Sequence, residues 1–136
     1  MSEVQKKILI LDDEPDVVTY LATLFEDHGY LVQSAGDGRQ GLEMARQWRP
    51  DLVTLDITMP ERSGIRFYRD LKEAEELAHI PVVVITAVTG YGGDPRSFEK
   101  FLSTRRQVPP PEAFVPKPID PGHLLKVVDK LLGIPA

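Results

Sequence analysis

Acidic residues end an apolar run near the start of this 136-residue chain. In "LILDDEPD", residues 9–16, the run stops at three consecutive acids that begin with Asp12 and Asp13. A further acid, Asp56, interrupts the otherwise apolar stretch "LVTLDITMP". Carboxylates without thiol or histidine partners suit a hard cation bound by oxygen. Mg²⁺ is the natural choice, because it bridges carboxylates to phosphate oxygens.

A hydroxyl and an ammonium group complete the candidate site. Thr86 lies near the end of "PVVVITA", and Lys117 follows "AFVP". A compact positive charge and a hydroxyl donor can stabilise a phosphoryl group on an aspartate such as Asp56, since this chemistry depends mainly on positioning and charge neutralisation. Taken singly, each residue also has a plainer interpretation. The acids at 12–14 could favour a helix dipole, Thr86 could be a strand former, and Lys117 could be a solvated charge.

The predicted elements bring these residues to one edge of a sheet. Short apolar or β-branched runs alternate with stretches whose apolar residues recur every three or four positions. We predict strands at residues 7–12, 30–35, 51–57, 81–87 and 113–116, and helices at 14–29, 38–48, 64–78 and 121–132. This alternation indicates βαβ crossovers. We therefore expect an α/β fold, a doubly wound five-stranded parallel sheet, (βα)5 and flavodoxin-like, with strand order 2-1-3-4-5.

Length and composition predict one domain over residues 1–136, with its core at about 6–133. The chain is 42% hydrophobic and 27% charged, with a net charge of −5, which gives no sign of a nucleic-acid-binding face. It has no cysteine, so disulfides and thiolate metal sites are excluded. There is no signal-peptide pattern and no apolar stretch of the roughly 20 residues that span a bilayer. We expect a cytoplasmic protein that binds neither nucleic acid nor membrane.

These motifs together resemble a response-regulator receiver domain of two-component signalling, similar to chemotaxis protein Y. The similarity runs from "ILILDDEPD" through "GDGRQGLEMARQWRPDLVTLDITMPERSG" and "PVVVITA" to "FVPKPID". The resemblance implies that Asp56 is the phosphoacceptor. It implies that Asp12 and Asp13 position Mg²⁺, and that Asp56 and the backbone carbonyl of Thr58 are further metal ligands.

The resemblance also implies roles around the fifth strand. Thr86 and Lys117 would each contact a phosphoryl oxygen, and Pro118 would follow a cis peptide bond. Phe114 would be a switch residue together with Thr86, although it could equally be plain core.

Such a domain would take a phosphoryl group from a sensor histidine kinase or a histidine phosphotransfer protein in a Mg²⁺-dependent step. It would signal to an unknown downstream protein through the face formed by its fourth helix, fifth strand and fifth helix. A phosphorylation-dependent dimer is one form that this output could take. The domain would be a switch that assists its own phosphorylation and dephosphorylation, and not a turnover enzyme.

Two other functions stay open. One is a phosphorylation-independent protein-binding module. The other is an aspartyl-phosphate phosphohydrolase of the haloacid-dehalogenase type, which would want a second acid where this chain has Thr58. The chain departs from the family in an extended region at 88–112, where Asp94 would begin a short helix. This region is either a tolerated surface insertion or a partner-specific docking face.

Crowded acids lead to two thermodynamic predictions. Like charges near Asp13 repel one another, so an empty site should be strained. We therefore predict that Mg²⁺ raises the melting temperature. We also predict that Asp13→Asn stabilises the metal-free protein.

Overall fold

The computed structural model describes residues 5–56, 63–86 and 111–134, without the side chains of Ser63 and Thr86. The predicted alternation of strands and helices is confirmed in this part of the chain. The elements are, in order, β1 (Lys7–Leu11), α1 (Pro15–Asp27), β2 (Leu31–Ala35), α2 (Gly38–Trp48), β3 (Leu52–Asp56), α3 (Ser63–Glu73), β4 (Val82–Thr86), β5 (Ala113–Pro116) and α5 (Pro121–Leu131).

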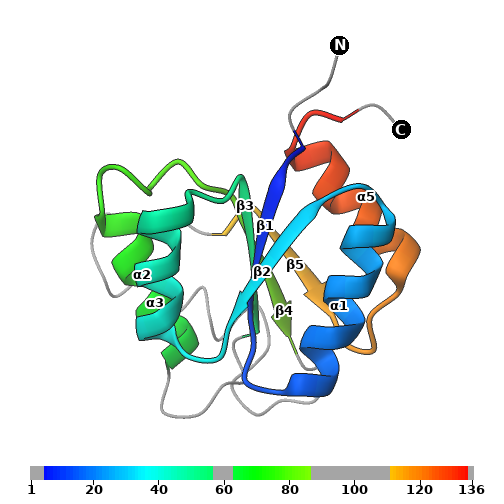
Figure 1. The fold of residues 1–136 in the computed structure, drawn as a ribbon, viewed down its shortest axis with the longest axis horizontal. Coiled ribbons are helices and arrows are strands. Elements are labelled where there is room, and N and C mark those ends of the chain that lie inside the picture. The colour runs from blue at the N-terminus through cyan, green and yellow to red at the C-terminus, as the bar shows by residue number, and fades with distance from the viewer. Residues whose placement is uncertain (1–4, 57–62, 87–110, 135–136) are drawn as a thin grey trace.

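The strands form one parallel sheet in the order β2-β1-β3-β4-β5, as the sequence predicts. The sheet lies between two layers of helices, with α2 and α3 on one face and α1 and α5 on the other (Figure 1). In the register, Ile8 of β1 pairs with Leu52 of β3, and Asp56 at the end of β3 pairs with Ile85 of β4. All five strands run the same way, so their carboxyl ends lie along one edge.

Alternate strand residues face opposite layers and form two cores. Leu9 and Leu55 belong to the core under α2 and α3, whereas Ile8 and Ile10 belong to the core under α1 and α5. Residues 8–11 of β1 and all of β3 are buried, which is why these strands read as continuous apolar runs. The central strands are therefore held from both sides, which gives the carboxyl edge a rigid support.

Local signals end or begin several helices. Gly29 has a φ of 96°, a conformation that suits glycine just after α1. Asp37 caps α2 by accepting a hydrogen bond from the Gln40 amide at 2.8 Å. Asp120 caps α5 in the same way from the His123 amide at 3.2 Å. These caps satisfy amide groups that have no partner within a helix.

One helix is shorter than predicted. The pattern at 64–78 predicts a helix to Ala78, but α3 ends at Glu73 and the chain then turns. The Leu77 amide donates to the Ala74 carbonyl, and the Lys72 ammonium donates to the Ala78 carbonyl at 3.2 Å. A lysine from within the helix thus satisfies a carbonyl of the turn, which an apolar periodicity does not reveal.

The predicted helix beginning near Asp94, and most of the extended region 88–112, lie outside the described residues. Across the described residues, every helix is too short or too polar to cross a membrane.

Candidate functional site

Three carboxylates meet at the carboxyl ends of β1 and β3. One oxygen each from Asp12, Glu14 and Asp56 lies within 4.8 Å of the other two. Asp12 and Asp56 are only 2% and 1% exposed, whereas Glu14 is exposed. The two buried acids come together because β1 and β3 are neighbours in the sheet. Glu14, the residue that directly precedes α1, adds the third carboxylate.

A lysine from the end of β5 joins this group. The Lys117 ammonium donates a hydrogen bond to Asp56 Oδ2 at 2.9 Å. Burial alone would lower the pKa of Lys117, but the bond to Asp56 and the charges of Asp56, Asp12 and Glu14 together raise it. Lys117 is thus held as a cation against the buried carboxylate. The peptide bond between Lys117 and Pro118 is cis, as the resemblance to receiver domains implies.

Asp12 is incompletely satisfied. Its Oδ1 accepts a hydrogen bond from the Glu14 amide at 2.9 Å. Its Oδ2 is buried and has no hydrogen-bond partner among the described residues. Burial raises the pKa of Asp12 to about 7, opposed by the Glu14 amide and reinforced by the charge of Asp56. At neutral pH this carboxylate therefore needs either a proton or a cation beside it.

The structure brings some of the predicted site residues together and leaves others apart. Asp12, Asp56 and Lys117 converge as predicted. Asp13 is exposed, and its carboxylate does not belong to the three-carboxylate group. Thr86 is the last residue of β4 and pairs with Pro116 of β5.

Of two further predicted residues, the structure describes Phe114 but not Thr58. Phe114 is half-buried and packs against the core under α2 and α3. Thr58 lies outside the described residues.

Glu14 is the group member that the motif did not single out as a ligand. One sequence signal could have drawn attention to it. Glu14 directly precedes the proline that begins α1, so it occupies the N-cap position of that helix. That position commonly carries a short polar side chain that caps the helix.

The donor set fits Mg²⁺. Among the described residues it consists of carboxylate oxygens, and one of them, the buried Oδ2 of Asp12, has no hydrogen-bond partner there. Hard divalent cations take such oxygen ligands, and Mg²⁺ commonly binds through one or two carboxylates while it keeps several waters. Asp12 and Asp56 are the buried oxygen ligands available to it, and Glu14 is the exposed one.

A hollow of about 480 Å³ opens beside Lys117. It lies between the start of α1 and the connection from β5 to α5, and Glu14, Tyr20 and Ile119 contribute to its lining. Through Glu14 and Lys117 the hollow adjoins the carboxylate group.

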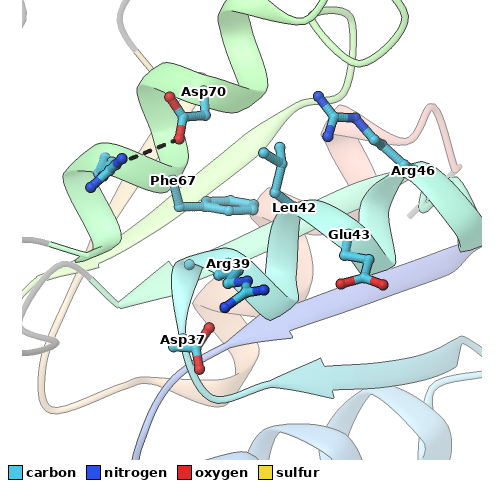
Figure 2. A pocket seen from close by; sticks show the side chains of 9 residues that line it. Asp37, Arg39, Leu42, Glu43, Arg46, Phe67 and Asp70 are labelled. Carbon is cyan, nitrogen blue, oxygen red and sulfur yellow. Dashed lines mark ion pairs between the residues drawn. The ribbon is translucent and has the colours of Figure 1, made fainter.

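A larger hollow of about 780 Å³ lies between α2 and α3 (Figure 2). Leu42 and Phe67 lie at its centre, and charged side chains of both signs surround them. Asp70 in this lining is paired with Arg66 at 4.0 Å. No residue of the three-carboxylate group lines this hollow, so its size does not make it the site of the chemistry.

The sequence profile of the response regulator receiver domain matches residues 8–129. The chain belongs to the response regulator receiver domain family.

Curated relatives agree with this assignment over nearly the whole receiver domain. Protein Rrf1 of Nitratidesulfovibrio vulgaris is 34% identical over 127 residues, which cover 93% of this chain and 83% of that protein. The polar-differentiation response regulator DivK of Brucella anthropi is 31% identical over 128 residues, which cover 94% of this chain and 97% of that protein.

A solved structure shows the same fold. The chemotaxis protein CheY4 of Vibrio cholerae superimposes with a TM-score of 0.79 at 24% identity, over 94% of this chain and 99% of that one. The receiver domain therefore has the flavodoxin-like arrangement expected from its sequence. Receiver domains are signalling modules of two-component systems and not turnover enzymes. They interact with histidine kinases or phosphotransfer proteins and with downstream partners.

Proposed function

We propose that this receiver domain is a switch that accepts a phosphoryl group on Asp56 in a Mg²⁺-dependent step. The observation that carries the proposal is the environment of this carboxylate. Asp56 is buried at the end of β3, accepts a hydrogen bond from Lys117 at 2.9 Å and lies beside Asp12, one oxygen of which has no partner among the described residues. A buried acid that faces both a cation and a second acid is typical of a reactive site rather than of a purely structural one.

The transfer would proceed by attack of an Asp56 oxygen on the phosphorus of a phosphohistidine. The donor would be a sensor histidine kinase or a histidine phosphotransfer protein. An O–P bond forms as the P–N bond breaks, and the electron pair of the broken bond stays on the imidazole nitrogen. The negative charge that develops on the phosphoryl oxygens needs neutralising for this step to be fast.

Residues around Asp56 would supply that neutralisation. Lys117, already bonded to Asp56, would move to a phosphoryl oxygen, and Thr86 would donate a hydrogen bond to another. Mg²⁺, when bound, supplies positive charge against the same oxygens. Asp12, Asp13 and the backbone carbonyl of Thr58 would position the ion together with Asp56.

The donor would enter by the hollow beside Lys117. Asp56 is only 1% exposed, so a phosphohistidine has to reach it from an open side. The hollow between α1 and the β5–α5 connection is open and includes Lys117 itself. This position supports α1 and the segment after β5 as the surface that a kinase or phosphotransfer protein contacts.

The output would pass through β5 to the face that β5 and α5 form with the fourth helix expected from the sequence. Phe114 lies on β5, and Lys117 directly follows this strand. Movement of Lys117 toward a phosphoryl group would therefore shift the strand that carries Phe114. The phosphorylated state would then favour one of two arrangements of this face. A downstream protein, or a second receiver in a phosphorylation-dependent dimer, would bind that arrangement.

The test is intact-mass measurement after incubation with acetyl phosphate and Mg²⁺. We expect one added phosphoryl group in the wild type and none in Asp56→Asn or without Mg²⁺. Asp70→Asn, which removes a surface acid between α2 and α3, is the matched control and should be phosphorylated like the wild type. An adduct that persists in Asp56→Asn would place the acceptor elsewhere.

A further inference from the structure

The start of α1 lacks the cap that other helices have. Glu14 occupies the N-cap position with an extended backbone (φ −99°, ψ 113°), yet its side chain makes no capping hydrogen bond. By contrast, Asp37 caps α2 and Asp120 caps α5 with their carboxylates. Short polar side chains favour this position because they reach the free amides of the first turn. A glutamate that does not cap is thus a locally poor choice for helix stability.

The Glu14 carboxylate lies instead with the acids of the phosphorylation site. One of its oxygens is within 4.8 Å of oxygens of Asp12 and Asp56. Its negative charge also contributes to raising the pKa of Lys117. Without a metal ion this placement is unfavourable, because it adds a further negative charge beside two buried acids that share one ammonium group, that of Lys117. A position that neither caps its helix nor relieves charge repulsion is expected where function has overridden local stability.

A second observation points to a ligand at this place. Asp12 is only 2% exposed, and its Oδ2 has no hydrogen-bond partner among the described residues. Leaving a buried carboxylate oxygen unpaired is costly unless something fills the position. The exposed Glu14 belongs to the same three-carboxylate group as Asp12 and also lines the hollow beside Lys117.

We propose that Glu14 is a further acidic group of the Mg²⁺ site, which adds negative charge to the cation bound by Asp12 and Asp56 instead of capping α1. The inference rests on the proposed function and goes beyond it. It assigns a role to a residue outside the motif and predicts that this residue trades helix stability for cation affinity.

Two substitutions separate charge from capping. Glu14→Gln removes the charge and keeps the length of the side chain, whereas Glu14→Ser introduces a capping hydroxyl. For both variants we expect Mg²⁺ binding, measured by calorimetric titration, to weaken by about 3- to 10-fold, as expected for losing one charge near a divalent ion in screened water. In the metal-free protein, Glu14→Ser should raise the melting temperature, because the helix gains a cap. A purely structural role would not change stability and affinity in opposite directions.

Asp16→Asn is the matched control. Asp16 is an exposed acid in the first turn of α1 and lines the same hollow, but it is not in the three-carboxylate group. We expect its removal to change Mg²⁺ affinity by less than about 2-fold. Unchanged affinity in Glu14→Gln, or an equal loss in Asp16→Asn, would overturn the inference.

The same titration separates this inference from the proposed function. If the wild type binds Mg²⁺ and is phosphorylated on Asp56 while Glu14→Gln binds Mg²⁺ equally well, only the role of Glu14 is wrong. If the wild type neither binds Mg²⁺ nor accepts a phosphoryl group, the proposed function is wrong, and the role of Glu14 fails with it.

Discussion

Charged side chains are buried at both edges of the sheet, but their surroundings differ. At the amino ends of the strands, the side chain of Lys72 is 2% exposed and donates to the carbonyls of Ile80 at 2.8 Å and Ala78 at 3.2 Å. Its ammonium also lies 3.6 Å from a carboxylate oxygen of Glu112, just before β5. Burial lowers the pKa of Lys72, and Glu112 opposes that shift. Here a buried charge is surrounded by groups that satisfy it.

The same edge contains a second satisfied cluster. The Tyr30 hydroxyl, at the start of β2, donates to one carboxylate oxygen of Asp129 on α5. His28 lies 3.0 Å from the other oxygen of that carboxylate. Burial and this bond raise the pKa of Tyr30, so its hydroxyl keeps its proton. Side chains far apart in the sequence thus tie α5 to the amino edge.

The carboxyl edge combines a satisfied pair, Lys117 with Asp56, with an unsatisfied oxygen of Asp12. Within the described ranges, two buried side-chain polar atoms have no hydrogen-bond partner, Asp12 Oδ2 and Thr54 Oγ1. Asp12 follows β1 directly and so lies at this edge, whereas Thr54 lies in the middle of β3. Among the described residues, the buried charge of the amino edge is thus surrounded by partners, whereas the carboxyl edge, where we propose that chemistry occurs, contains a buried carboxylate oxygen without one. Four substitutions test this contrast.

Replacing Lys72 by methionine should have the largest effect. Methionine retains most of the apolar stem, but the Ala78 and Ile80 carbonyls lose a donor and Glu112 loses its cation. We expect the free energy of unfolding, measured by urea denaturation, to fall by about 2–3 kcal/mol. The control is Lys126→Met at an exposed position of α5, which should change it by less than about 0.5 kcal/mol. Equal effects of the two substitutions would show that the amino edge does not depend on this buried charge.

Replacing Asp12 by asparagine should act in the opposite direction. In the metal-free protein at neutral pH, we expect the free energy of unfolding to rise by about 1–2 kcal/mol, because a buried charge next to Asp56 is removed. The same substitution should abolish most of the rise in melting temperature that Mg²⁺ causes.

The Asp12 effect has a definite pH dependence. The pKa of Asp12 is raised from 3.8 to about 7 on folding, so the folded protein holds this proton more tightly than the unfolded chain. Its contribution to stability is therefore fully present below about pH 4 and is lost as the pH rises to about 7. The advantage of Asp12→Asn should grow over that interval in urea denaturation without metal.

Asp13→Asn, at the exposed neighbouring acid, is the comparison variant and should stabilise the metal-free protein less than Asp12→Asn does. The sequence suggested Asp13→Asn for the stabilising effect, but burial assigns the larger share to Asp12. A pH-independent difference between the wild type and Asp12→Asn would contradict the charge argument.

Replacing Tyr30 by phenylalanine tests the second satisfied cluster. It removes the hydroxyl that donates to Asp129 and leaves His28 as the described partner of that carboxylate. We expect a loss of about 1 kcal/mol in urea denaturation. Tyr20→Phe, at an exposed tyrosine of α1, should be close to neutral. No loss in Tyr30→Phe would mean that the buried bond contributes nothing beyond what water offers the unfolded chain.

Replacing Thr54 by valine should have the smallest effect, and a stabilising one. The substitution exchanges a buried hydroxyl without a partner for a methyl group of nearly the same shape. We expect a gain of about 0.5–1 kcal/mol in thermal or urea unfolding. Thr23→Val at an exposed site of α1 controls for the change of residue type. A loss of stability on Thr54→Val would show that its hydroxyl is satisfied.

Much of the fold and part of the site could be predicted from the sequence. Alternating β-branched runs and amphipathic stretches led to five parallel strands in the observed order, and to Asp12, Asp56 and Lys117 at one edge. This prediction succeeds because the carboxyl ends of parallel strands share an edge whatever the side-chain details.

The tertiary structure alone decided which of the three consecutive acids face the site. Asp12 is buried, Asp13 is exposed, and the Glu14 carboxylate lies with those of Asp12 and Asp56. Successive side chains at the end of a strand point in different directions. A run of acids in the sequence does not show which of these side chains points into the site. The pairing of Lys72 with Glu112 was equally hidden, because it depends on how α3 and β5, distant in the chain, pack beside the same sheet edge.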